Sequence, residues 1–393
     1  MSPERECKGM KALAPVLVLF AVVLFSLPSS QAQSAPIPTE EAAAAARDAA
    51  GDQPDHPGPL ATGLSPKMTR PAIFKAMKKV ADWQLKEAEG YYNIDWTYAA
   101  LYDGLLAASK ATGDRRYHDR VLKVAEQNHW ELGPRFAHAD DEAIGLTYLT
   151  LYAEDPKPER LAPTREAMDR LLARPDDPQQ ILWWWCDALY MAPKVLAQLS
   201  VATGDRKYLE FADHQWGITS AALYDPAEHL YFRDKRFLAM HEANGQKIFW
   251  SRGNGWVIAG LAMMLERMPE DDPDRAMFLH QFHQMAERIA GLQQADGLWH
   301  ASLLDPAAYP SPEISGSAFF TYAIAWGIHH HILDRKIYLP VVTRAWHAML
   351  SHVYADGRLG SIQPIGGEPG KYKPSSSYVY GVGAFLLAGS ELA

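Results

Sequence analysis

Two kinds of helical segment alternate along the chain, and this alternation restricts the possible folds more than any other feature. One kind is apolar on nearly every side and rich in Ala and Gly. These segments span 97–110, 142–152, 188–201, 257–265, 317–328 and 380–392. Because a helix without a polar face is buried on all sides, they predict an inner layer of helices.

The other kind of segment is amphipathic, and one precedes each inner segment. Apolar residues recur in it at three- and four-residue spacing, as at Phe278, Phe282, Met285 and Ile289. The amphipathic segments span 70–86, 116–128, 159–173, 207–220, 275–292 and 338–353. Two concentric rings of six helices fit this order with short connections, so we predict an all-α, single-domain (α/α)6 toroid. An open helical solenoid is the alternative, because a repeat array shows similar alternation.

The connections between these segments differ in length. The sequence Ala-Thr-Gly-Asp-Arg-Arg-Tyr at 111–117 recurs at 202–208 with one change, each time as a short turn from an inner to an amphipathic segment. The return connections are long, at 129–140, 174–185, 221–251, 293–314 and 354–376. All long loops should therefore lie at the end where the inner helices begin. Long loops on a rigid scaffold usually carry function, and helix N-termini favour an anionic ligand.

The N-terminal region has the features of a secretory signal peptide over residues 1–32. Arg5, Lys8 and Lys11 precede an apolar run at 12–27, which is short for a membrane-spanning helix. Residues 33–66 are rich in Ala, Pro, Gly and Asp and are expected to be a flexible lead-in, followed by a catalytic domain at 67–393. We therefore predict an exported protein that is periplasmic or extracellular.

Charge and cysteine content limit the partners of the chain. With 38 Lys and Arg against 47 Asp and Glu, the net charge is −9, which argues against nucleic acid or an anionic membrane as a partner. Cys7 belongs to the signal segment, so Cys186 is left without a disulfide partner and is expected to be a buried small residue. We find no cofactor or metal signature. The sequence leaves the oligomeric state open.

The end where the inner helices begin is rich in aromatic and chemically able residues. They include Tyr92, Trp96, His138, Asp140, Asp141, Trp184, Asp187, Arg252, Asn254 and Trp256. Aromatic faces stack on the C–H faces of sugar rings, while carboxylates and Arg bind the polar edges. Although any single Trp could equally belong to the core, the mixture favours a carbohydrate ligand.

Asp187 opens the third inner helix, and Asp140 and Asp141 open the second. Each could act only as an N-cap, because Asp at a helix start accepts backbone N–H bonds. The Trp residues before Asp187 would instead remove solvent from its carboxyl group, raise its pKa and make it a proton donor. Arg252 could clamp a substrate carboxylate in a bidentate pair or form a structural salt bridge.

Several stretches resemble a known family. They are His-Ala-Asp-Asp-Glu-Ala-Ile-Gly at 138–145, Trp-Trp-Cys-Asp-Ala-Leu-Tyr-Met-Ala-Pro at 184–193, Trp-Ser-Arg-Gly-Asn-Gly-Trp at 250–256, and the helical stretches 315–326 and 380–388. The chain resembles the unsaturated rhamnogalacturonyl and glucuronyl hydrolases of glycoside hydrolase family 105, which is related to family 88. This resemblance also implies a toroid.

The resemblance implies a reaction on an unsaturated acidic oligosaccharide left by a polysaccharide lyase. Water adds across the C4=C5 vinyl ether of the terminal uronic acid instead of attacking the anomeric carbon. The proton donor of the family falls on Asp187, and the second carboxylate falls on Asp141 or, as a second choice, on Asp140. Arg252 and Trp256 match the family's substrate-contacting pair.

One departure from the family affects the substrate. Rhamnogalacturonan-type members place a His after the Leu-Tyr pair, where this chain has Leu-Tyr-Phe-Arg-Asp at 230–234, including Arg233. Rhamnogalacturonan is therefore one candidate source beside glucuronyl-rhamnose units such as those of ulvan or arabinogalactan side chains. An inverting glycosidase or sugar epimerase on the same toroid, or a non-catalytic exported sugar-binding protein, are the alternative functions.

Overall fold

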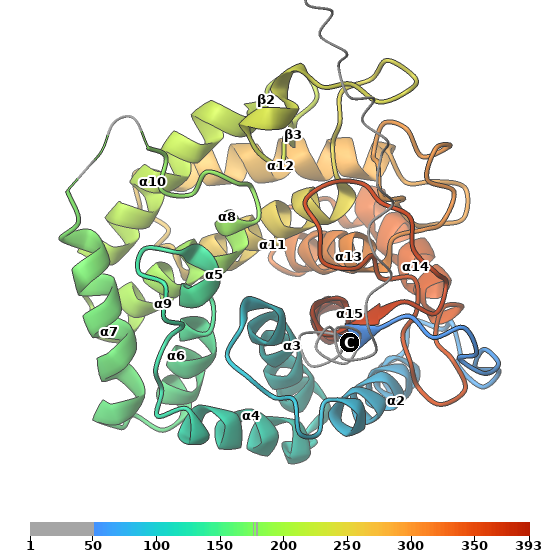
Figure 1. Cartoon of the computed structure of the whole chain (residues 1–393), viewed down its shortest axis with the longest axis horizontal. Helices are drawn as coiled ribbons and strands as arrows, with labels where there is room; N and C mark the ends of the chain where they lie inside the picture. The colour runs from blue at the N-terminus through green and yellow to red at the C-terminus, as the bar shows by residue number, and fades with distance from the viewer. Residues whose placement is uncertain (1–50, 176, 178–179) are drawn as a thin grey trace, which may run out of the picture.

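The computed structural model describes residues 51–175, 177 and 180–393, and its helices form two concentric rings (Figure 1). The inner ring contains α3 (Trp96–Thr112), α5 (Ala139–Glu142) with α6 (Gly145–Glu154), α8 (Ala188–Met191) with α9 (Pro193–Thr203), α11 (Ser251–Arg267), α13 (Ile314–His329) and α15 (Val379–Leu392). The outer ring contains α2 (Arg70–Glu87), α4 (Arg115–Gln127), α7 (Pro158–Leu172), α10 (Lys207–Leu223), α12 (Arg275–Gly291) and α14 (Arg335–Leu350).

The inner ring is closed. Helix α3 contacts α6, and the contacts continue through α9, α11, α13 and α15 back to α3. A Cβ on Gly104 of α3 would overlap the carbonyl oxygen of Gly383 on α15, so the first and last inner helices pack backbone to backbone. This closure confirms the (α/α)6 toroid and excludes the open solenoid.

The short turns of the recurring motif end α3 and α9 as expected. Gly113 and Gly204 have positive φ angles of 74° and 71°, and their N–H groups donate to carbonyl oxygens of the preceding helix turn. Glycine adopts this left-handed conformation without a steric penalty. These two turns lie at the ends of α3 and α9, opposite the long loops that lead into the inner helices.

Two inner helices are less regular than their sequences suggested. The segment 188–201 was expected as one helix, but α8 ends at Met191 and α9 begins at Pro193. Proline has no backbone N–H to continue the helical ladder and is favoured in a first turn, which explains the break. The second inner helix is likewise divided into α5 and α6.

The described part of the predicted lead-in is attached to the toroid. Strand β1 (Gly51–Asp52) pairs antiparallel with β4 (Ser377–Tyr378), and Lys373 Nζ lies 2.7 Å from Asp55 Oδ1. The side chain of Lys75 also donates to the Gly63 carbonyl oxygen. Backbone pairing and side-chain contacts thus place residues 51–66 against the toroid. The predicted signal peptide and residues 33–50 lie outside the described residues.

Two small features complete the description. Strands β2 (Tyr224–Asp225) and β3 (Leu230–Tyr231) form a hairpin after α10, followed by the 3-10 helix η1 (Lys235–Ala239). Within the described residues, the helices are all too short or too polar to cross a membrane.

Candidate active site

Asp187 lies at the start of α8, in a segment that is held by the loop after β3. The Cys186 N–H donates to the Arg233 carbonyl oxygen at 2.8 Å, and Trp185 forms a β-bridge with Asp234. This pairing brings the side chains of Asp187 and Arg233 together. Arg233 Nε lies 3.4 Å from Asp187 Oδ2, so a guanidinium group faces the candidate proton donor.

The Asp187 carboxyl group is largely removed from water, with 8% of the residue exposed. Burial raises its pKa, and the positive charges of Arg233 and Arg252 oppose this rise. Its side chain makes no capping hydrogen bond to α8, which argues against the N-cap interpretation. Cys186 is fully buried as expected, and burial raises the pKa of its thiol well above the usual range.

Asp140 and Asp141 have different surroundings, although they are adjacent on α5. Asp141 accepts hydrogen bonds from the Arg135 N–H at 2.8 Å and from Arg135 Nε at 2.7 Å, so its charge is neutralised locally. Burial and the nearby charge of Asp187 raise the pKa of Asp140 to about 7. The carboxyl group coupled to Asp187 is thus that of Asp140, whereas the sequence had favoured Asp141.

His138 and Trp184 border this acidic pair. The His138 ring lies 5.2 Å from the Trp185 ring, and its Nδ1 is 3.8 Å from Asp140 Oδ2. Burial, followed by the charge of Arg135, lowers the pKa of His138. Trp184 is 49% exposed, and the Arg233 guanidinium carbon lies 5.4 Å from its ring centroid. An exposed indole beside a cation and a carboxyl group suits a sugar ring.

Arg252 does not form the expected clamp. It is fully buried, and its Nη1 and Nη2 donate to the carbonyl oxygens of Gln363 and Pro364 at 2.6 and 2.8 Å. The guanidinium group lies over the rings of Trp250 and Tyr380. We had two predictions for Arg252, a bidentate clamp on a substrate carboxylate and a structural salt bridge. Both are wrong, because the loop before β4 covers the side chain. Its charge still acts on Asp187.

Asn254 and Trp256 are also fully buried, so they support the site instead of presenting a surface to substrate. Asn254 Oδ1 accepts from the Tyr231 N–H at 2.8 Å, and its Nδ2 donates to the Tyr231 carbonyl oxygen at 3.0 Å. This pair of bonds fixes β3, which leads to Arg233. The Trp256 ring packs 4.3 Å from the Phe319 ring.

Of the two remaining predicted aromatic residues, Trp96 lies at the site and Tyr92 lies against the outer ring. Trp96 is partly buried and stacks on Tyr380 at 5.4 Å, with its edge towards Trp256. The hydroxyl of Tyr92 donates to the Leu85 carbonyl oxygen of α2, and Arg120 of α4 lies over its ring. These contacts explain Tyr92 as a packing residue between the outer helices, and the structure does not bring it to Asp187.

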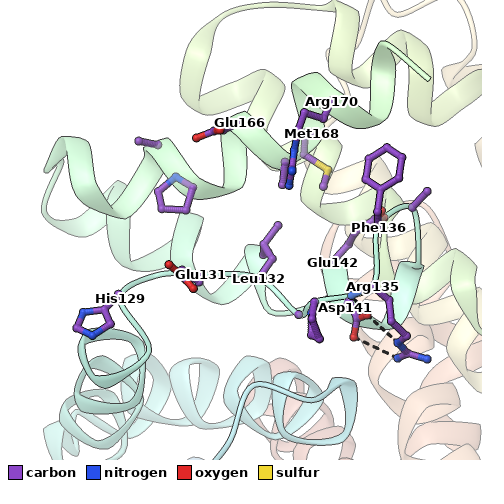
Figure 2. Close-up of a pocket in the computed structure, with 16 residues that line it drawn as sticks. His129, Glu131, Leu132, Arg135, Phe136, Asp141, Glu142, Glu166, Met168 and Arg170 are labelled. Atoms are coloured by element: carbon purple, nitrogen blue, oxygen red, sulfur yellow. Dashed lines mark hydrogen bonds and ion pairs between the residues drawn. The ribbon is translucent and has the colours of Figure 1, made fainter. Parts of the chain in front are cut away.

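A pocket of about 430 Å³ lies between α7 and the loop before α5, and Asp141 lines it (Figure 2). Arg135 and Asp141 lie at one edge of it, and Phe136, Glu142 and Arg170 also line it. Burial raises the pKa of Glu142 to about 8. Sequence reasoning missed Arg135, which no motif marks, and Glu142, which follows the singled-out aspartates directly.

Glu313 is a further buried residue that the sequence did not reveal. Its carboxylate accepts hydrogen bonds from the N–H groups of Gly316 and Gln363 at 2.6 and 3.0 Å, and from the Ser315 hydroxyl at 2.7 Å. It therefore caps α13 and at the same time anchors the loop that covers Arg252. Only its place before an inner helix could have suggested this role.

Comparison with known proteins agrees with this arrangement. The chain is 41% identical over 341 residues to an unsaturated 3S-rhamnoglycuronyl hydrolase of Formosa agariphila, covering 81% of this chain and 90% of that protein. A protein of the same name from Alteromonas sp. (strain LOR) is 37% identical over 319 residues, covering 76% and 77%.

Solved structures extend the comparison. A glycosyl hydrolase family 88 protein from Bacteroides vulgatus has a TM-score of 0.78 and 32% identity, covering 82% of this chain and 98% of that one. A family 105 glycoside hydrolase from C. acetobutylicum shares the fold, with a TM-score of 0.68 at 22% identity over 80% and 98% of the two chains. Residues 71–393 match the sequence model of Glycosyl Hydrolase Family 88. The chain therefore belongs to Glycosyl Hydrolase Family 88 and is a glycoside hydrolase.

Proposed function

We propose that this enzyme removes a 4,5-unsaturated uronic acid from the non-reducing end of lyase-generated oligosaccharides. The observation that carries the proposal is the carboxyl pair of the buried Asp187 and the partly buried Asp140, set beside Arg233 and the exposed Trp184. The names of the two relatives describe hydrolases of an unsaturated glycuronyl sugar, which agrees with this substrate class.

The reaction needs a proton donor and a base in one place. A carboxyl group donates its proton to C4 of the unsaturated sugar, and the positive charge that develops is shared by C5 and the ring oxygen. Water then adds at C5 and gives its proton to a carboxylate. The resulting hemiketal opens to a ketone, and the hemiacetal left at C1 releases the remaining sugar. Burial raises the pKa of both carboxyl groups, so both hold a proton to higher pH than an ordinary Asp, as the donor step requires.

We assign the donor role to Asp187 and a supporting role to Asp140. Asp187 is the more buried of the two, and it matches the donor position of the family motif. Burial raises the pKa of Asp187, while burial and the like charge of Asp187 raise the pKa of Asp140. Arg233 then balances the charge of Asp187 after the proton has left.

For the released sugar we propose a rhamnose that carries a sulfate group, as in fragments of ulvan. The two relatives are named for a 3S-rhamnoglycuronyl substrate. Arg233 supports this choice, because it places a permanent cation just after β3, in the segment where rhamnogalacturonan-type enzymes carry a His. Guanidinium groups bind sulfate and carboxylate groups through paired N–H donors.

We further propose that residues 1–32 direct export and that 67–393 form the catalytic unit. The basic and apolar pattern of the N-terminus supports the first proposal. The family match over residues 71–393 supports the second.

The test uses the ultraviolet absorbance of the conjugated double bond. The parent protein should abolish this absorbance with an unsaturated glucuronyl-rhamnose disaccharide, and faster when the rhamnose is 3-sulfated. Asp187→Asn should lower kcat by about 10²- to 10⁴-fold, the usual contribution of a general acid. The matched control is Asp119→Asn on the exposed face of α4, which should keep full activity.

Two outcomes would contradict the proposal. Full activity of the Asp187→Asn enzyme would remove Asp187 from the mechanism. Cleavage of saturated oligosaccharides by a parent enzyme that leaves the unsaturated disaccharide intact would instead favour an inverting glycosidase.

A further inference from the structure

Three aspartates meet at the end of the toroid opposite Asp187. Asp213 lies on α10, near the end where that helix begins, whereas Asp272 and Asp274 belong to the loop between α11 and α12. One carboxylate oxygen from each residue lies within 4.8 Å of the other two. The cluster therefore connects α10 with the loop that precedes α12.

Asp213 is the unusual member of this cluster. It is 5% exposed, and its Oδ1 atom is buried without a hydrogen-bond donor among the described residues. A buried carboxylate oxygen normally has a donor or a cation, because removing its charge from water is costly. Burial and the charges of Asp272 and Asp274 raise the pKa of Asp213 to about 8.

The surrounding protein charges do not balance the cluster. Arg206 Nη2 lies 2.7 Å from Asp272 Oδ2, but its side chain is 45% exposed. The carboxylate of Glu210 adds further negative charge near Asp213. One guanidinium group thus faces four carboxyl groups, and it contacts Asp272 and not the buried Asp213.

The loop carboxylates are held in place by the backbone. The Asp274 N–H donates to Asp272 Oδ1 at 3.0 Å, and the Arg275 N–H donates to the Asp272 carbonyl oxygen at 3.2 Å. A loop that is already ordered opposite a rigid helix loses little conformational entropy when it binds an ion, which favours binding.

We propose that Asp213, Asp272 and Asp274 bind a calcium ion that fastens α10 to the loop before α12. Calcium takes oxygen ligands at about 2.4 Å, so two oxygens on opposite sides of the ion are about 4.8 Å apart. The three carboxylate oxygens lie within that span. Water completes the shell on the exposed side of Asp274. Zinc is disfavoured because it prefers His and Cys ligands, and magnesium because it demands near-ideal octahedral geometry and is usually bound through only one or two carboxylates.

The rival explanation is a proton shared within the cluster, which would leave Asp213 neutral without any metal. The two explanations predict different responses. A calcium ion stabilises the folded protein in proportion to its concentration, whereas a shared proton gives stability that depends on pH and not on calcium.

The experiment measures the melting temperature of the full-length protein after chelator treatment, with and without added calcium chloride. A rise of about 4 °C is expected when free calcium is about 100 times the dissociation constant. Magnesium chloride at the same concentration should give a smaller rise. Below the melting temperature, chelation should leave kcat and KM unchanged, because the cluster lies at the end away from Asp187.

Two variants and one control decide the result. Asp213→Asn and the exposed Asp274→Asn should both abolish or strongly reduce the calcium-dependent rise. The matched control is Asp271→Asn, an exposed residue of the same loop outside the cluster, which should keep it. No calcium effect on the parent protein, or an equal effect on the parent and both cluster variants, would overturn the proposal.

Discussion

At the scale of single residues, the neighbouring Asp140 and Asp141 show what a sequence can and cannot reveal. The motif identified the pair, but successive side chains of a helix point about 100° apart, so only one can face Asp187. Arg135 decides which of the two aspartates faces Asp187, because it holds Asp141 by a hydrogen bond. Arg135 lies in the long loop between α4 and α5, where the sequence shows no periodic pattern. Loop positions of this kind come from tertiary packing and are not encoded in local spacing.

The two aspartates should respond differently to the same substitution. Asp140→Asn removes the charge coupled to Asp187 and should lower kcat by about tenfold or more, with little change in melting temperature. Asp141→Asn leaves the Arg135 guanidinium group without its anionic partner and should mainly lower the melting temperature. Initial rates on the unsaturated disaccharide and thermal melts of both variants provide the check. The opposite pattern would restore Asp141 as the second carboxylate.

The carboxyl pair also predicts how the rate depends on pH. The donor step needs a proton on Asp187, and burial raises the pKa of Asp187, so kcat/KM should fall as pH rises through that raised pKa. In Asp140→Asn the donor Asp187 is still present, so the alkaline fall should remain. Rate profiles of both proteins between about pH 5 and 9 test this. A parent profile without an alkaline fall would contradict the assignment.

Arg252 illustrates the opposite failure at this scale. The resemblance placed Arg252 against the substrate, whereas its side chain is fully buried. The guanidinium group points into the protein, where carbonyl oxygens of residues 363 and 364 accept its hydrogen bonds. A sequence shows that an Arg is present, whereas burial depends on which loop folds over it.

At the scale of elements, the sequence predicted the helices better than it predicted their interruptions. The outer helix predicted at 70–86 is Arg70–Glu87, and that predicted at 275–292 is Arg275–Gly291. Their apolar stripes are local signals, which explains the agreement. The hairpin of β2 and β3 was not predicted, because its two-residue strands are too short for any alternation to be visible.

Asn254 should position this hairpin and, through it, Arg233. Asn254→Ala leaves the buried N–H and carbonyl groups of Tyr231 without side-chain partners, which costs about 2–4 kcal/mol of unfolding free energy. Because Arg233 follows β3, kcat/KM should fall as well, although Asn254 is buried away from substrate. The control is Asn128→Ala at the end of α4, which loses a helix-end hydrogen bond and should keep kcat/KM. Unchanged kcat/KM in Asn254→Ala would show that the hairpin does not position the site.

At the scale of the whole molecule, closure of the inner ring was implied by the number of helix pairs but not demonstrated by it. An open array and a closed ring share the same alternation, and they differ only in whether the first and last inner helices touch. In this chain they touch through glycines, at Gly104 of α3 and Gly383 of α15. Closure fixes all inner-helix N-termini around one axis, which is why residues from distant segments reach Asp187 (Figure 1).

The glycine contact between α3 and α15 should therefore be critical for stability. In Gly383→Ala the new methyl group would overlap the Ala100 carbonyl oxygen, which belongs to a rigid helix backbone and cannot yield easily. Overpacking of this kind costs about 1–3 kcal/mol, so the melting temperature should fall. The matched control is Gly217→Ala on α10, where the added methyl meets no atom within 4 Å and removal of a helical glycine should stabilise by about 0.5–1 kcal/mol. Opposite shifts in the two thermal melts are expected, and an equal rise in both would show that ring closure tolerates a wider spacing between the first and last inner helices.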